Sequence, residues 1–145
     1  MLIISHRGNL NGTDPETENT NWQIVKAITA GVHVEVDVWG IKGELWLGHD
    51  RPVEKIIFSL LTLGFITPRL IYHCKDIHAA EFCKEKGYHY FMHELDKRVL
   101  TSEGYFWTFP NQQICSHSIA CLPELHPKWD ISKAAGICTD YPLKP

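Results

Sequence analysis

The sequence lacks a long apolar run and a cluster of basic residues, and these two absences exclude several classes of protein. The longest mostly apolar run, Ile56 to Ile66, is too short to span a bilayer as a helix. The start of the chain has no basic region followed by an apolar core, so we expect no signal peptide. The net charge is −3. Because binders of nucleic acids or anionic membranes need a basic surface, we expect neither function.

The sequence also lacks a Cys-x-x-Cys pair, although it contains five cysteines. An odd number of cysteines without metal-ligand spacing favours free thiols in a reducing cytoplasm over a disulfide framework or a zinc knuckle. With 145 residues, of which 44% are hydrophobic and 21% charged, the composition is that of one soluble globular domain spanning residues 1–145.

The strongest pattern lies between Val32 and Asp50. Valines at positions 32, 34, 36 and 38 alternate with His33, Glu35 and Asp37, which in a strand gives one all-valine face and one face with two carboxylates. We expect the valine face to pack on apolar elements such as helices. Burying two ionised carboxylates side by side is costly unless a cation compensates, which indicates a metal. Alternatively, both carboxylates face water on a half-exposed antiparallel strand.

A second short apolar run, Leu45 to Leu47, follows this strand across Gly43 and Glu44. A tight turn at this point predicts that the chain folds back, so that His49 and Asp50 approach the two carboxylates. A histidine and two acidic groups would then converge on one spot.

The first 31 residues predict a strand, a loop and a helix. The apolar run Leu2 to Ile4 is typical of a strand buried on both faces, and it ends at His6 and Arg7. In parallel α/β folds, ligands bind at the carboxyl ends of strands. A capping box at Thr20 predicts a helix over 21–30 that ends at Gly31.

The rest of the chain continues as alternating strands and helices and then becomes a series of short strands. We expect helices over 54–63 and 77–86, and strands over 70–74, 88–92, 105–109, 114–115, 120–122 and 136–138. Since a complete (β/α)8 barrel needs roughly 200 residues or more, the predicted fold is α/β, a pared-down (β/α) TIM-type barrel with several outer helices missing. Its uncovered apolar surface predicts a homodimer.

Several motifs in this order resemble the glycerophosphodiester phosphodiesterases, within the superfamily of phosphatidylinositol-phospholipase-C-like phosphodiesterases. The resemblance is strong over residues 3–50, patchy over 70–76 and short over 105–109 and 136–142. Its motifs are His6-Arg7-Gly8, Glu18-Asn19-Thr20, Glu35-x-Asp37 after Gly31, Gly48-His49-Asp50, Trp107-Thr108 and the segment from Gly136 to Pro142.

The resemblance implies a role for each matching side chain. His6 and His49 would be the general acid and base, and Arg7 would hold a phosphate oxygen. Two carboxylates, Glu35 and Asp37, would bind a divalent cation, usually magnesium or calcium. Lys75 matches a lysine of the family that is also expected to face the phosphate, and Glu18 would support the site from behind the residues that contact substrate or metal.

One position departs from the family's pattern. The family has a third carboxylate two residues before the lysine, whereas this chain has His73. An imidazole ligand favours manganese or zinc over calcium, or the site is weaker. Alternatively, a water molecule, Glu94 or Glu124 completes the metal shell. His93, Glu94 and Asp96 have two interpretations, a contact at the rim of the site or the charges of a solvated loop, and we prefer the solvated loop.

Three functions remain open. The leading hypothesis is a metal-dependent phosphodiesterase that cleaves a small-molecule or lipid-derived phosphodiester, such as a glycerophosphodiester or a cell-envelope sugar phosphodiester, by acid–base catalysis with two histidines. The second is a phosphodiester lyase that releases a cyclic phosphate. The third is a catalytically inactive module that binds a phosphorylated ligand, which the missing acid at position 73 favours.

Overall fold

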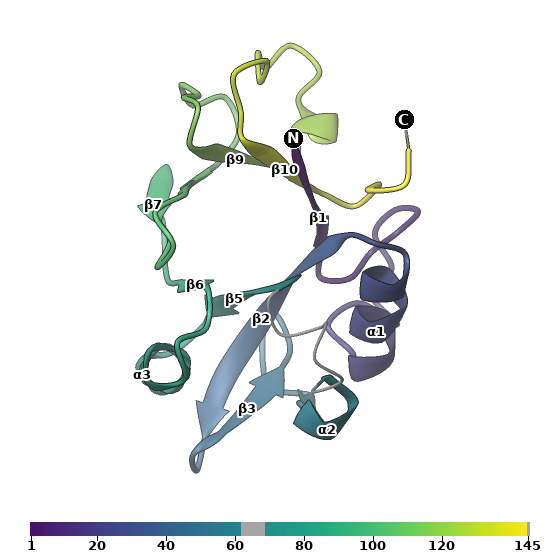
Figure 1. Cartoon of the computed structure of the whole chain (residues 1–145), viewed down its shortest axis with the longest axis vertical. Helices are drawn as coiled ribbons and strands as arrows, with labels where there is room; N and C mark the ends of the chain where they lie inside the picture. The colour runs from purple at the N-terminus through teal and green to yellow at the C-terminus, as the bar shows by residue number, and fades with distance from the viewer. Residues whose placement is uncertain (62–68, 145) are drawn as a thin grey trace.

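The computed structural model describes residues 1–61 and 69–144, and its main feature is a curled ten-stranded sheet (Figure 1). The strand order is β4-β3-β2-β1-β10-β9-β8-β7, and β5 pairs with both β2 and β6. The strands are β1 (Leu2–His6), β2 (His33–Ile41), β3 (Glu44–Leu47), β4 (Glu54–Lys55), β5 (Leu70–Cys74), β6 (Tyr90–Phe91), β7 (Arg98–Leu100), β8 (Phe106–Thr108), β9 (Ser118–Cys121) and β10 (Gly136–Thr139).

Most neighbouring strands are parallel. The parallel pairs are β1 with β2 and β10, β9 with β8 and β10, and β5 with β2 and β6. Antiparallel pairing is confined to β2–β3, β3–β4 and β7–β8. Because the parallel strands run in one direction, their carboxyl ends meet along one edge of the curled sheet, where residues from distant parts of the chain come together.

The prediction of a pared-down (β/α) TIM-type barrel is wrong. The sheet forms a curled half-barrel, and within the described residues only α1 (Asn21–Thr29) and α3 (Ile77–Lys86) are helices longer than one turn. After β6, the described residues contain no α-helix; the one helical turn there is the 3-10 helix Pro123–Leu125, and β7 pairs antiparallel with β8. The backbone nitrogen of Ser102, which follows β7, donates to the carbonyl oxygen of Tyr90 on β6 at 2.8 Å.

Both long helices begin where the sequence predicted; α3 also ends as predicted, whereas α1 ends one residue earlier, at Thr29. The Thr20 hydroxyl accepts a hydrogen bond from Gln23 N and begins α1. The carboxylate of Asp76 accepts from Ala79 N and begins α3, which ends at Gly87 in the left-handed region with a φ of 67°. Glycine adopts this conformation without the steric cost that a Cβ atom brings.

Two apolar clusters pack against opposite faces of the sheet. Val34, Val36 and Val38 of β2 are fully buried against side chains of α1 and α3, which confirms that the valine face packs on helices. The second cluster lies on the face that carries Glu35, because Ile71 is the register partner of that residue. Its buried members are Ile4, Ile71, Phe91, Trp107, Ile119, Cys121 and Cys138.

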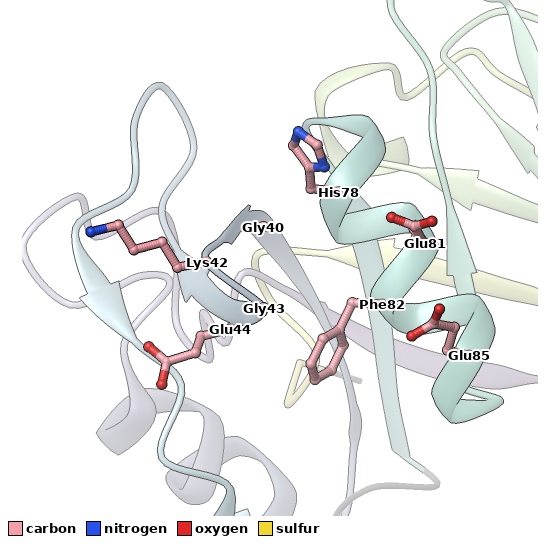
Figure 2. A pocket seen from close by; sticks show the side chains of 8 residues that line it. All are labelled: Gly40, Lys42, Gly43, Glu44, His78, Glu81, Phe82 and Glu85. Carbon is pink, nitrogen blue, oxygen red and sulfur yellow. The ribbon is translucent and has the colours of Figure 1, made fainter.

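The hairpin of β2 and β3 confirms the predicted turn at Gly43, and α3 packs closely against it (Figure 2). A Cβ atom at Gly40 would lie 2.5 Å from the backbone nitrogen of Ala79, so only glycine permits this approach. A groove of about 310 Å³ between hairpin and helix contains none of the predicted site residues. It is lined by Gly40, Lys42, Gly43, Glu44, His78, Glu81, Phe82 and Glu85.

Three local predictions differ from the structure. The helix expected over 54–63 is replaced by β4, which pairs with β3, and by the four-residue helix α2 (Phe58–Leu61); residues 62 and 63 lie outside the described part of the chain. Residues 114–115 are not a strand, and β7 was not predicted. In the described ranges, no helix has the length and apolar character needed to cross a membrane.

Candidate active site

A pocket of about 420 Å³ opens among side chains at the carboxyl ends of the parallel strands. It contains all seven side chains that the sequence assigned to catalysis, phosphate binding or metal binding. The residues that line it are His6, Arg7, Glu35, Asp37, His49, His73, Lys75, His93, Glu94, Trp107, Phe109, Pro110, Cys121 and Leu122.

Glu35, Asp37 and His73 form a compact group that could hold a metal ion. One potential ligand atom from each side chain lies within 4.8 Å of the other two. Asp37 on β2 and His73 on β5 are register partners, and His73 Nδ1 lies 2.9 Å from Asp37 Oδ1 and 3.7 Å from Glu35 Oε1. Both carboxylates are almost fully buried. Glu94 lines the same pocket but does not belong to this group.

The two carboxylates have opposite electrostatic environments. Burial and the neighbouring charge of Asp37 raise the pKa of Glu35. Burial alone would also raise the pKa of Asp37, but His73, Arg7 and Lys75 outweigh it and hold that pKa well below its ordinary range. The charge of Glu35 is therefore incompletely compensated by the protein. A cation bound between the two carboxylates would compensate it, so this donor set fits a divalent metal.

Arg7 is held in place by acidic side chains on both sides. Its Nε lies 3.0 Å from Asp37 Oδ2, and its Nη1 donates to Glu18 Oε1 at 2.8 Å, in agreement with the supporting role expected of Glu18. The Arg7 backbone nitrogen donates to Glu35 Oε2 at 3.2 Å. Lys75 Nζ approaches Asp37 Oδ1 at 3.6 Å, so both cations line the pocket beside the carboxylates.

Asn19 fixes the position of Asp37. Its amide nitrogen donates to Asp37 Oδ2 at 2.9 Å, and its amide oxygen accepts from Asp37 N at 3.0 Å. Asn19 has a φ of 54°, which asparagine tolerates better than most residues. Although the Glu18-Asn19-Thr20 motif was recognised in the sequence, no role had been predicted for Asn19.

His6 forms a buried ion pair with Asp140. His6 Nδ1 lies 2.8 Å from Asp140 Oδ1, an oxygen that also accepts from Asn9 Nδ2 at 2.9 Å. Burial by itself lowers the pKa of His6, but the Asp140 hydrogen bond and the charge of Glu35 outweigh burial and raise that pKa to about 9. His6 is therefore an imidazolium at neutral pH in the metal-free site, and its other nitrogen, Nε2, is left for the pocket.

His49 occupies the rim of the pocket. Its Nδ1 lies 2.7 Å from Asp50 Oδ1, so His49, like His6, has an aspartate at Nδ1. The side chain of His49 is 42% exposed, and Asp50 is almost entirely exposed. The pair of His49 and Asp50 is much more exposed to solvent than the pair of His6 and Asp140. Solvent therefore screens the charge of Asp50 at His49 more than the charge of Asp140 at His6.

The interpretation of His93 as part of a solvated loop is wrong. His93 lines the pocket, and its ring stacks on that of His73 with 4.6 Å between ring centroids. Burial and the positive charges of His73 and Lys75 lower the pKa of His93 to about 4. The imidazole of His93 is therefore neutral at physiological pH.

The sequence predicted no role for Asp140, and for His93 the solvated loop was preferred to a contact at the rim of the site. Each follows a strand, β10 and β6 respectively, at the edge where the other site residues lie. A polar side chain just beyond a buried strand was the available signal, and the same signal had singled out His6 and Arg7.

No protein-family model matches this chain, and neither a curated protein nor a solved structure matches it. The family suggested by the sequence motifs is therefore a prediction that rests on the residues alone.

Proposed function

We propose that this protein is a metal-dependent phosphodiesterase that cleaves an alcohol-linked phosphodiester, as its motifs suggest. The observation that carries the proposal is the convergence of two histidines, two cations and a buried acidic group in one pocket. These residues come from β1, β2, β5 and the segment after β3. Phosphodiester cleavage needs this combination, because charge develops on phosphoryl oxygens while protons move at the attacking and leaving oxygens.

His6 is the general acid in this proposal. The ion pair with Asp140 keeps it protonated at neutral pH and directs Nε2 toward the pocket. A protonated imidazole at that position donates its proton to the leaving oxygen. His49 is the general base, which accepts the proton of the attacking hydroxyl group or water molecule. Its exposed position on the rim gives that nucleophile a route from solvent.

Arg7 and Lys75 bind the phosphoryl oxygens, and Glu35, Asp37 and His73 would hold the divalent cation. Such a cation supplies electrostatic stabilisation of charge on the phosphoryl group. The imidazole ligand favours manganese or zinc over calcium and magnesium. Glu18 and Asn19 keep Arg7 and Asp37 in place through the hydrogen bonds described above.

Hydrolysis and cyclisation use the same acid and base and differ in the attacking hydroxyl. If a water molecule attacks, the product is a phosphomonoester. If a hydroxyl of the substrate attacks, the enzyme is a lyase that releases a cyclic phosphate. The phosphorus NMR spectrum of the product distinguishes the two outcomes.

One observation favours a second candidate function, a catalytically inactive module that binds phosphorylated ligands. Asp37 already contacts three basic side chains, Arg7, His73 and Lys75. These contacts compensate its charge without a metal, and a pocket with these cations could retain a phosphate without cleaving it.

The decisive experiment is turnover of a chromogenic phosphodiester by metal-stripped protein with magnesium, calcium, manganese or zinc added separately. The active-site variants are His6→Gln and Glu35→Gln. The matched controls are His117→Gln and Glu81→Gln, because both side chains are exposed and lie outside the pocket. Metal-dependent turnover that is lost in the first two variants and kept in the controls supports the proposal. Phosphate-ester binding without turnover by any metal form favours the binding module instead.

Two further proposals concern the compartment and the oligomeric state of the protein. All five cysteines are free, which supports a reducing compartment such as the cytoplasm. Leu100 and Phe106, register partners on β7 and β8, expose apolar side chains that a homodimer would cover. Sedimentation at micromolar concentration tests this dimer, and a monomer would contradict it.

A further inference from the structure

The pocket has two chemically different walls. The wall formed by β1, β2, β5 and the segment after β3 carries the charged and catalytic side chains described above. A second wall, which adjoins the first where His93 stacks on His73, is formed by residues at or just beyond the ends of β6, β8 and β9, and it is mostly apolar. Its members are His93, Glu94, Trp107, Phe109, Pro110, Cys121 and Leu122. A phosphodiester bound with its phosphate on the first wall would place one of its alcohol groups against the second.

Aromatic rings of this second wall continue a column that begins in the core. Trp107 stacks on Phe91 at 4.5 Å between centroids, Phe91 on His73 at 4.7 Å, and His73 on His93 at 4.6 Å. The ring of Phe109 completes the column at 4.4 Å from His93, tilted by 47°. The core thus fixes the positions of His93 and Phe109, and both are half-buried at the pocket surface.

The stacking prevents His93 from sharing a metal ion with His73. The lone pair of an imidazole nitrogen lies in the plane of its ring, and these two planes are only 13° from parallel. One ion cannot lie in both ring planes, because the planes are nearly parallel and the rings are stacked on each other. Within the described residues, His93 is likewise outside the group of close metal-ligand atoms. His93 lies between His73 and Phe109 in the column, so it supports Phe109, whose ring ends the column at the pocket.

The charges on this wall select against an anionic group. Among the described residues that line this wall, Glu94 is the only carboxylate, and no lysine or arginine is present. Arg7 and Lys75 both lie on the first wall, beside Asp37, where the proposed function has them bind the phosphate of the diester. A second phosphate or a carboxylate on the alcohol would lie beside Glu94 without a compensating cation.

We propose that Phe109, supported by His93, forms a subsite for a flat, uncharged ring on the alcohol portion of the phosphodiester. The subsite rests on the proposed function, because the phosphate must bind on the first wall. Stacking against an aromatic side chain contributes beyond the burial of apolar area, and it requires a ring in the ligand. The preferred substrate therefore has one anionic group, the diester, and an uncharged ring beside it.

Ligand binding tests this subsite without requiring turnover. The probes are diethyl phosphate, ethyl phenyl phosphate and ethyl 4-carboxyphenyl phosphate, each titrated calorimetrically into protein that has been loaded with zinc. We expect the phenyl ester to bind about 3- to 10-fold more tightly than the diethyl ester. The carboxyphenyl ester should lose that advantage. In NMR spectra of the complex, phenyl protons should show nuclear Overhauser effects to Phe109.

Variants separate a stacking subsite from general apolar attraction. Phe109→Leu keeps an apolar side chain, and it should reduce the preference for the phenyl ester to about 1. His93→Phe keeps a ring in the column and should retain the preference. Phe106→Leu is the matched control, because Phe106 lies on β8, three residues before Phe109, but outside the pocket. It should retain the preference as well.

The outcomes distinguish the subsite from the proposed function. Equal binding of the phenyl and diethyl esters by the unmodified protein would overturn the subsite and leave the phosphate site intact. Failure of all three esters to bind would overturn the proposed function, and the subsite with it. Retention of the phenyl preference in Phe109→Leu, without Overhauser effects to Phe109 in the unmodified protein, would also overturn the subsite.

Discussion

Replacement of Asp140 by asparagine should lower the pKa of His6 and remove a pH-dependent part of the stability. Asparagine fits the site, because its oxygen can accept from His6 Nδ1 and Asn9 Nδ2 as Asp140 Oδ1 does. Its amide nitrogen would then face the Thr13 hydroxyl, which donates to Asp140 Oδ2 at 2.8 Å and can accept as well. The variant thus removes a charge while it keeps the hydrogen bonds.

The magnitude follows from the pKa of His6, which rises from 6.5 to about 9 in the folded protein. That rise corresponds to about 3 kcal/mol of additional stability, which the charged imidazole provides in the folded state. Because the folded pKa exceeds the unfolded one, the contribution is complete below pH 6.5 and is lost as the pH rises through about 9. Glu35 also raises this pKa, so Asp140→Asn removes most of the effect and not all of it.

The assays are NMR titration of the His6 ring and urea unfolding of metal-stripped protein at pH 6 and pH 10. In the unmodified protein the His6 ring should titrate near pH 9, and in Asp140→Asn near or below pH 6.5. The difference in unfolding free energy between the two proteins should be about 2 to 3 kcal/mol at pH 6 and much smaller at pH 10.

Asp50→Asn is the matched control, because it removes the aspartate of an exposed histidine pair and should change the stability little at either pH. A His6 ring that titrates at or below pH 6.5 in the unmodified protein would refute the reasoning. So would a stability difference that is the same at pH 6 and pH 10.

Three further predictions concern the metal group and the packing of α3. Glu35→Gln should leave the metal-free protein at least as stable above neutral pH, because burial and Asp37 disfavour the Glu35 charge. The same variant should abolish the rise in melting temperature that manganese causes in the unmodified protein. A rise that persists in the variant would contradict this prediction. His73→Asp should shift binding measured by calorimetry from manganese and zinc toward magnesium and calcium, and an unchanged order would exclude His73 as a ligand. Gly40→Ala should lower the unfolding free energy in urea by about 1 to 3 kcal/mol, because its Cβ would lie 2.5 Å from Ala79 N. An unchanged stability would contradict this close approach of β2 and α3.

The local features of this fold were predictable because they depend on residues close together in sequence. Alternation of valines and carboxylates in β2 determined which face packs on helices and which face lines the pocket. Thr20 and Asp76 determined where α1 and α3 begin, since a capping side chain bonds to a backbone nitrogen three residues away. The positions of His6, Arg7 and Lys75 followed from their place at the ends of predicted strands.

The tertiary structure decided what depends on contacts between distant residues. Asp140 is 134 positions from His6 in the chain, and their ion pair exists because β10 and β1 are neighbours in the sheet. His93 reaches the pocket because β6 pairs with β5, which stacks its ring on His73. The half-barrel, with β7 antiparallel at its edge, depends likewise on which strands pair. Periodicity fixes the faces of each element, but pairing between elements is set by the summed packing of the whole chain, and no local pattern encodes that sum.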